Sequence, residues 1–263
     1  MKLNITITTA LILGLIFSTN VAAETLVIPG TGDGVAVLEA VGGEFQKKTG
    51  ISVEIPKSIG SGGGVKAAGS EKVNLARVAR EIKDKEKHFG LSYTPVFQIP
   101  TVFLVHSSVG IENLTEQQVL DIFSGKVTNW KDVGGSDSEI IVVRREEGDS
   151  SLGNLQRTFP GFKDITLTPT AFLAKKTYLM VAQIANRENT ISFGPLDVAL
   201  TNNLKILKIN NKEASSAGYP YYGTIGLVYK DNNLTDISQK FLAFITSAEA
   251  YPAIKNAGGN PLK

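Results

Sequence analysis

One short segment combines an arginine, carboxylates and hydroxyls at a spacing that could hold an anion. Residues 145–151 read Arg-Glu-Glu-Gly-Asp-Ser-Ser, follow an apolar run at 140–143 and precede a possible helix at 152–159. The guanidinium of Arg145 offers planar, paired N–H donors. A helix N-terminus adds free backbone N–H groups and a favourable dipole. A simpler interpretation is a polar turn in which an Asp or Ser caps the helix.

Two other turns, both rich in Gly, favour the anion-binding interpretation. Residues 29–34 (Pro-Gly-Thr-Gly-Asp-Gly) follow a predicted strand at 25–28 and precede a helical pattern at 35–48. Residues 58–64 (Ser-Ile-Gly-Ser-Gly-Gly-Gly) follow a predicted strand at 51–55 and precede a second helical pattern. All three segments therefore occupy strand-to-helix junctions, where backbone N–H groups are free to bind anions.

The N-terminal residues and the composition limit the class of protein. Residues 1–23 have the order of a signal peptide: a basic start, an apolar run too short for a membrane span and a small-residue site ending at Ala23. We expect cleavage there and export to a periplasm. The chain contains no Cys, which excludes disulfides and thiolate metal sites. After loss of Lys2, 26 basic side chains face 25 acidic ones, a balance that argues against a nucleic-acid partner.

The order of predicted elements indicates an α/β fold with two lobes. Alternating strands and helices over residues 25–78 predict a parallel sheet with right-handed crossovers. Long apolar strands near residues 97 and 219 are the natural places for the chain to enter and leave a second lobe. We therefore expect a first lobe from 24–97 and 218–263 and a second lobe from 98–217. Ligands of such folds bind beyond strand ends and in clefts between domains.

Three segments together resemble one known family. They are residues 59–65 (Ile-Gly-Ser-Gly-Gly-Gly-Val), residues 114–135, which include Phe-Ser-Gly-Lys-Val-Thr-Asn-Trp-Lys-Asp-Val-Gly-Gly, and residues 145–151. The mature chain resembles, over nearly all its length, the periplasmic phosphate-binding proteins of ABC transporters. This resemblance implies the type 2 periplasmic-binding-protein fold, in which each lobe is a mixed, mainly parallel sheet flanked by helices. The middle segment identifies the family, and we expect its Trp130 to pack inside the second lobe.

The resemblance also implies which residues hold the ligand. Three loops would surround an oxyanion with backbone N–H groups and hydroxyls. Arg145 would clamp the anion, and Glu147 would hold Arg145 in place. The implied ligand contacts come from Thr31, Gly32 and Asp33 of the first loop, Ser61 of the second, and Arg145, Ser150 and Ser151 of the third.

Two departures from the family pattern leave the selectivity open. Ala79 stands where classical members carry an Asp that accepts the proton of hydrogen phosphate. Arg80 matches an arginine of other members, so the resemblance implies that Arg80 also belongs to the ligand-binding residues. Asp149 stands where the family usually has Ser. One hypothesis is that Asp149 supplies the displaced carboxylate, which favours a protonated oxyanion and penalises sulfate. The alternative is that Asp149 caps the following helix and pairs with Arg77 or Arg80.

We therefore predict an exported binding protein that captures phosphate or a close tetrahedral oxyanion. The resemblance implies that it delivers the ligand to the membrane permease of an ABC transporter, as a monomer without cofactor, metal or catalytic residues. One alternative is a binding protein for another oxyanion such as sulfate. A further alternative, an exported phosphatase on the same fold, has little support. Only His88 and His106 are present, and neither has a nucleophile partner nearby in the sequence.

Overall fold

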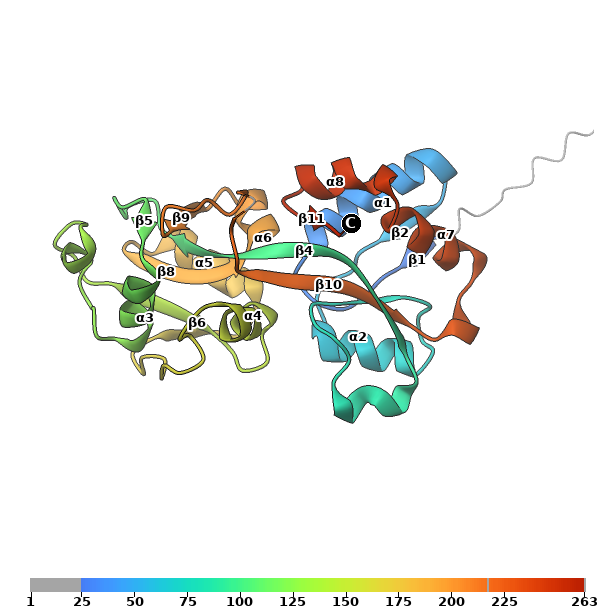
Figure 1. Cartoon of the computed structure of the whole chain (residues 1–263), viewed down its shortest axis with the longest axis horizontal. Helices are drawn as coiled ribbons and strands as arrows, with labels where there is room; N and C mark the ends of the chain where they lie inside the picture. The colour runs from blue at the N-terminus through green and yellow to red at the C-terminus, as the bar shows by residue number, and fades with distance from the viewer. Residues whose placement is uncertain (1–24, 217, 263) are drawn as a thin grey trace, which may run out of the picture.

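The computed structural model describes residues 25–216 and 218–262. The chain folds into two lobes that are connected by two long strands (Figure 1). The predicted signal peptide, residues 1–23, lies outside the described residues. The connecting strands β4 (Ser92–Val105) and β10 (Tyr222–Tyr229) pair antiparallel and run from one lobe into the other. The predicted two-lobed α/β fold is confirmed.

The first lobe is built from both ends of the described chain. A parallel pair of strands and the helices around it form its body. Its elements are β1 (Thr25–Val27), α1 (Val35–Thr49), β2 (Ser52–Glu54), α2 (Gly60–Gly69), β3 (Ala76–Val78), the 3₁₀ helices η1 (Asp84–Phe89), η3 (Asp231–Asn233) and η4 (Ala248–Ala250), α7 (Asp236–Ile245), α8 (Tyr251–Asn256) and β11 (Asn260–Pro261).

The prediction of one parallel sheet over residues 25–78 is wrong for β3. This strand forms its ladder with β10, antiparallel, and meets the end of β1 only through a single parallel bridge between Gly30 and Arg77. The close approach at that bridge requires Gly30, because a Cβ there would lie 1.8 Å from the carbonyl oxygen of Arg77. The local sequence pattern predicted that β3 is a strand, but its partner is β10, which comes much later in the chain.

The second lobe surrounds the far half of β4. Strands β8 and β9 pair antiparallel with β4, while β6 pairs parallel with both β7 and β8. Its elements are β5 (Asn113–Leu114), α3 (Glu116–Ser124), the 3₁₀ helix η2 (Trp130–Val133), β6 (Ile141–Arg145), α4 (Ser150–Thr158), β7 (Phe172–Ala174), α5 (Thr177–Asn186), β8 (Thr190–Pro195), α6 (Leu196–Thr201) and β9 (Lys205–Ile209). The sheets are mixed as expected, but the pairing is not mainly parallel, because β4 pairs antiparallel along its length.

Two large hydrophobic cores, one in each lobe, are joined by the connecting strands, and a smaller third cluster lies between α2, β3 and β10. Phe97 and Ile99 of β4 join the core of the first lobe, whereas the next apolar residues, from Val102 onward, join that of the second. Ile225 of β10 belongs to the first core and Tyr221, just before β10, to the second. We propose that the chain crosses between lobes at these points. The residue limits 24–97, 98–217 and 218–263 stay a prediction.

The family-identifying segment has a structural role, as predicted. Thr115 and Gln118 form the expected capping box at the start of α3, and Gly125 ends the helix in the left-handed conformation. Trp130 is buried in the core of the second lobe, and its indole N–H donates to the carbonyl of Asn189 at 3.1 Å. No helix among the described residues is both long and apolar enough to cross a membrane.

Candidate anion-binding cleft

A cleft of about 880 Å³ lies between the lobes, and four helices begin at its wall. Val35 begins α1, Gly60 begins α2, Ser150 begins α4 and Thr177 begins α5, and all four line the cleft. The first N–H groups of a helix have no intrahelical partner, and the helix dipole places partial positive charge beside them. Four helix N-termini around one cleft therefore favour an anion.

The first loop is held in shape by Arg77. Its fully buried guanidinium donates to the carbonyls of Thr31 and Pro56, both at 2.7 Å, and to that of Ile28. The N–H of Thr31 in turn donates to the carbonyl of Arg77 at 3.1 Å. Burial lowers the pKa of Arg77 to about 10, a value that still leaves it charged at neutral pH. Because its donors are occupied by backbone, Arg77 supports the loop and does not line the cleft.

The second loop presents Ser61 to the cleft. Its Oγ accepts a hydrogen bond from the backbone N–H of Ala79 at 3.0 Å, so its own O–H remains able to donate. The side chain is 8% exposed. Ala79, which replaces the family's Asp, therefore contributes its backbone N–H to orienting Ser61.

The third loop buries Arg145 against carboxylates. The side chain is 3% exposed, and one terminal nitrogen lies 2.7 Å from a carboxylate oxygen of Asp149. Its Nε lies 3.2 Å from Glu146 and donates to the carbonyl of Ala174 at 3.1 Å. The prediction that Glu147 holds Arg145 is wrong, because Glu146 and Asp149 have that role.

Asp149 combines the two roles that the sequence set against each other. Its carboxylate accepts from the N–H of Leu152 at 3.0 Å and so caps α4. It pairs with Arg145 and not with the predicted Arg77 or Arg80. It also lines the cleft, where its side chain is 7% exposed. Burial raises its pKa, and the adjacent Arg145 works in the opposite direction.

Two predicted site residues do not line the cleft. Both terminal nitrogens of Arg80 donate to the carboxylate of Glu86, at 2.7 and 2.8 Å, which directs the arginine away from the cleft. Ser151 is fully buried, and its Oγ has no hydrogen-bond partner among the described residues. The cleft does bring together the other predicted residues, Thr31, Gly32, Asp33, Ser61, Arg145, Asp149 and Ser150.

The sequence prediction missed one carboxylate beside the site. Asp197 of α6 is 1% exposed, and burial raises its pKa to about 6. The backbone N–H groups of Val198, Ala36 and Gly34 partly offset this rise. Neither carboxylate oxygen of Asp197 has a hydrogen-bond partner among the described residues, so these N–H groups stabilise the carboxylate from beyond hydrogen-bond distance. The available signal was an Asp shortly after the predicted strand at 191–194, in the segment Pro195-Leu196-Asp197.

The lobes touch each other across the cleft. The hydroxyl of Thr31, in the first lobe, lies 3.2 Å from that of Ser150, in the second. Helix α6 of the second lobe packs against α1 of the first, which brings Asp197 to the α1 N-terminus. Residues from both lobes therefore reach one shared volume.

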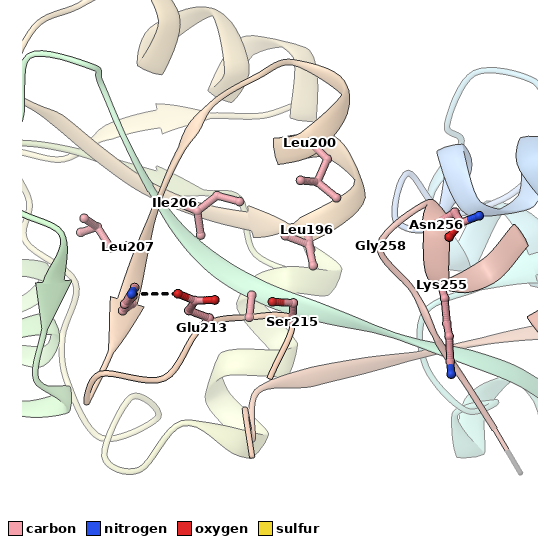
Figure 2. Close-up of a pocket in the computed structure, with 11 residues that line it drawn as sticks. Leu196, Leu200, Ile206, Leu207, Glu213, Ser215, Lys255, Asn256 and Gly258 are labelled. Carbon is pink, nitrogen blue, oxygen red and sulfur yellow. Dashed lines mark ion pairs between the residues drawn. The ribbon is translucent and has the colours of Figure 1, made fainter. Parts of the chain in front are cut away.

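A second hollow, of about 360 Å³, lies on the other side of α6. Figure 2 shows Leu196 and Leu200 of α6 on one side of the hollow and Lys255, Asn256 and Gly258 of the first lobe on the other. The hollow is bounded by apolar side chains and by an ion pair of 2.8 Å between Lys208 and Glu213. It lacks the converging helix N-termini and the buried arginine of the larger cleft.

Comparison with known proteins agrees with this geometry. Residues 18–249 match the family described as the PBP superfamily domain. The chain belongs to this family. A solved Clostridium perfringens protein with bound phosphate, provisionally described as a phosphate ABC transporter substrate-binding protein, has 26% identity and a TM-score of 0.80, covering 91% of this chain and 100% of that one.

More distant members of the PBP superfamily are also similar. The phosphate-binding protein PstS of Borreliella burgdorferi is 22% identical over an alignment of 216 residues that covers 76% of this chain and 76% of that protein. An ABC-type phosphate transport receptor from Vibrio cholerae has 19% identity and a TM-score of 0.64, covering 90% of this chain and 100% of that one. At that identity the Vibrio structure supports the fold alone.

Proposed function

We propose that this PBP-superfamily chain captures phosphate in the cleft between its lobes and delivers it to the membrane permease of an ABC transporter. The observation that carries the proposal is the meeting of four helix N-termini with the buried guanidinium of Arg145 in one cleft. Helix N-termini and arginine forks both bind tetrahedral oxyanions. The C. perfringens relative holds phosphate, and the B. burgdorferi relative is named for it.

The proposed contacts come from both lobes. Thr31, Asp33 and Ser61 would meet the ligand from the first lobe, and Arg145 and Ser150 from the second. A ligand that touches both lobes binds their closed arrangement better and so shifts the population toward it. The predicted export to a periplasm, the permease and the monomeric state belong to the same proposal and rest on the family resemblance.

A binding role without catalysis also remains a proposal. The named relatives are binding proteins and a transport receptor. In the described chain, Nδ1 of His88 lies 2.8 Å from the carbonyl of Lys85, to which it can only donate, and His106 contacts Ser108, so neither activates a cleft hydroxyl. An assay of the purified protein with a phosphomonoester should show no hydrolysis.

Calorimetric titration with phosphate and with sulfate tests the function. We expect saturable phosphate binding, and preferential sulfate binding would favour the alternative of another oxyanion. The matched pair of variants is Arg145→Ala and Arg144→Ala, because adjacent residues of β6 point to opposite faces of the sheet. Retained phosphate binding in Arg145→Ala would contradict the site, and absence of phosphate binding in the unmodified protein would contradict the function.

A further inference from the structure

The cleft holds more buried negative charge than an anion site should tolerate. Asp33 and Asp197 are 4% and 1% exposed, and the side chain of Asp149 is 7% exposed. Asp33 and Asp149 line the cleft and Asp197 lies beside Asp33, while Arg145 is the one buried cation among the described residues that line the cleft. Arg77, also buried, lies behind the first loop, where backbone carbonyls occupy its donors. Arg145 is already paired with Asp149 at 2.7 Å and with Glu146 at 3.2 Å. Three ionised carboxylates would therefore outweigh the arginine before any ligand arrived. A bound dianion would add to this repulsion, which is strong where water is excluded.

Other charged groups around the cleft do not remove the imbalance. Glu39 of α1, Lys57 just before the second loop and Lys176 before α5 line the cleft but are exposed to solvent, which screens them. Glu146 of the third loop is about one-third exposed and adds negative charge. The N-terminus of α1 favours ionised carboxylates, but Asp33 does not cap it, because its cap is Gly34 and no side chain bonds to it.

Asp33 is the buried carboxylate that lines the cleft with neither an ion pair nor a helix-capping bond among the described residues. Asp149 has an arginine and the N–H of Leu152, and Asp197 has nearby backbone N–H groups. Asp33 has the hydroxyl of Ser150 nearby. Burial raises its pKa well above the ordinary value, and the charges of Asp149 and Asp197 raise it further, while Arg145 and Ser150 lower it. Unlike Asp197, Asp33 lines the cleft and faces the ligand volume.

We propose that Asp33 binds the ligand as a neutral carboxyl that donates a hydrogen bond, so that phosphate capture is coupled to proton uptake. The inference rests on the proposed function and names what governs the selectivity of that site. A proton from solvent occupies one carboxylate oxygen of Asp33, and the O–H then points to a ligand oxygen. A protonated carboxyl gains a donor that the carboxylate lacks. Affinity then falls as pH rises, by up to about tenfold per pH unit for one proton.

Titration with sulfate distinguishes protons taken up by the protein from protons taken up by phosphate. Sulfate stays a dianion from mildly acidic to mildly alkaline pH, so any protons taken up on its binding go to the protein. Calorimetry of the full mature chain in two buffers of different ionisation enthalpy counts these protons. We expect sulfate binding to appear or tighten as pH falls, with proton uptake, and phosphate binding to weaken as pH rises.

The decisive variant is Asp33→Asn, with Asp164→Asn as the matched control. The amide is neutral at every pH and keeps a donor, whereas Asp164 is exposed and lies outside the cleft. At alkaline pH we expect Asp33→Asn to bind sulfate at least about tenfold more tightly than the unmodified protein, with little pH dependence. The control should behave as the unmodified protein, and thermal unfolding should show that both variants are folded.

Failure of this inference and failure of the function give different results. Phosphate binding that Asp33→Asn weakens at every pH would show that Asp33 is an ionised acceptor and overturn the inference alone. The inference alone is also overturned if the unmodified protein binds phosphate but Asp33→Asn binds no sulfate. It is likewise overturned if the affinity of the unmodified protein for both anions is independent of pH. If the unmodified protein binds neither anion at any pH, the proposed function itself fails.

Discussion

At the scale of single residues, the site depends on how the donors of Arg145 are shared. Its guanidinium pairs with Asp149 and Glu146 while lining the cleft, so it has a structural role in addition to the ligand-binding role that we propose. Arginine suits this because its planar fork serves several oxygens at once. Asp149 is similarly shared between the α4 cap and the arginine. Each side chain therefore constrains the other before a ligand binds.

Replacing Arg145 should remove most of the affinity. We expect Arg145→Ala to weaken phosphate binding at least about 100-fold, because a charge-assisted contact is lost and Asp149 is left unpaired beside the anion. The same unpaired Asp149 should lower the free energy of unfolding by about 3 kcal/mol. Calorimetry and denaturant unfolding measure the two effects. Arg144→Ala should leave the affinity unchanged, and equal losses in both variants would contradict the assignment.

Replacing Ser61 should have a smaller effect. Ser61→Ala removes one hydroxyl donor from the cleft and the acceptor for the N–H of Ala79, but the backbone N–H groups at the start of α2 remain. A neutral hydrogen bond contributes about 1 kcal/mol, so we expect a loss of about tenfold or less in phosphate affinity by calorimetry. A loss as large as that of Arg145→Ala would mean that Ser61, not the arginine fork, dominates binding.

At the scale of elements, the helices that begin at the cleft place their backbone N–H donors there, whereas the caps of helices away from the cleft contribute only to stability. Helix α1 begins at Val35 only because Gly34 adopts a φ of 74°, where a Cβ would lie 3.0 Å from Ile225 and Phe97. Helix α3 begins with a full capping box, but Thr115 lies in the second lobe away from the cleft. The two kinds of helix start can therefore be separated by experiment.

Removing the α3 cap should affect folding and leave binding unchanged. Thr115→Ala deletes the hydroxyl that accepts from the N–H of Gln118 at 3.1 Å. The expected cost is about 1 kcal/mol in the free energy of unfolding, measured by denaturant titration. Phosphate affinity should stay within error of the unmodified protein. A change in affinity would show that the two lobes transmit strain from α3 to the cleft.

At the scale of the whole molecule, Asp197 links pH to the packing of the lobes. It lies on α6 of the second lobe and is buried at the α1 N-terminus of the first. Burial raises its pKa from an ordinary value of 3.8 to about 6. The folded protein therefore binds this proton more tightly than the unfolded chain does. Its contribution to stability is complete below the unfolded pKa and is lost as pH rises through about 6.

Neutralising Asp197 should reduce this pH dependence. The pKa difference corresponds to about 3 kcal/mol of stability lost between acidic and neutral pH. We expect Asp197→Asn to be more stable than the unmodified protein at neutral pH and to lose less stability across that interval. Thermal and denaturant unfolding at several pH values measure both. Asp164→Asn provides the surface control, and an unchanged slope in Asp197→Asn would contradict the interlobe role.

The sequence alone determined most of the local structure and the loops of the site. Turn residues, caps and periodicity are local signals, so the helix start at Val35 and the capping box of α3 were predictable, and the helix predicted at 152–159 was found at Ser150–Thr158. The grouping of the three loops came from the family resemblance, because nothing in local spacing brings residues 31, 61 and 145 together. The strand partners were not predictable, since the partner of β3 comes from β10, far along the chain.

Only the tertiary structure decided which charged side chains reach the cleft. The sequence left open whether Arg77 or Arg80 reaches the ligand beside Arg145, yet backbone carbonyls occupy the first and Glu86 the second. Asp197 enters the neighbourhood of Asp33 because α6 packs against α1. Charge interactions depend on distance and burial through space. The sequence therefore determined the loops, and the packing of the two lobes determined the charge around the site.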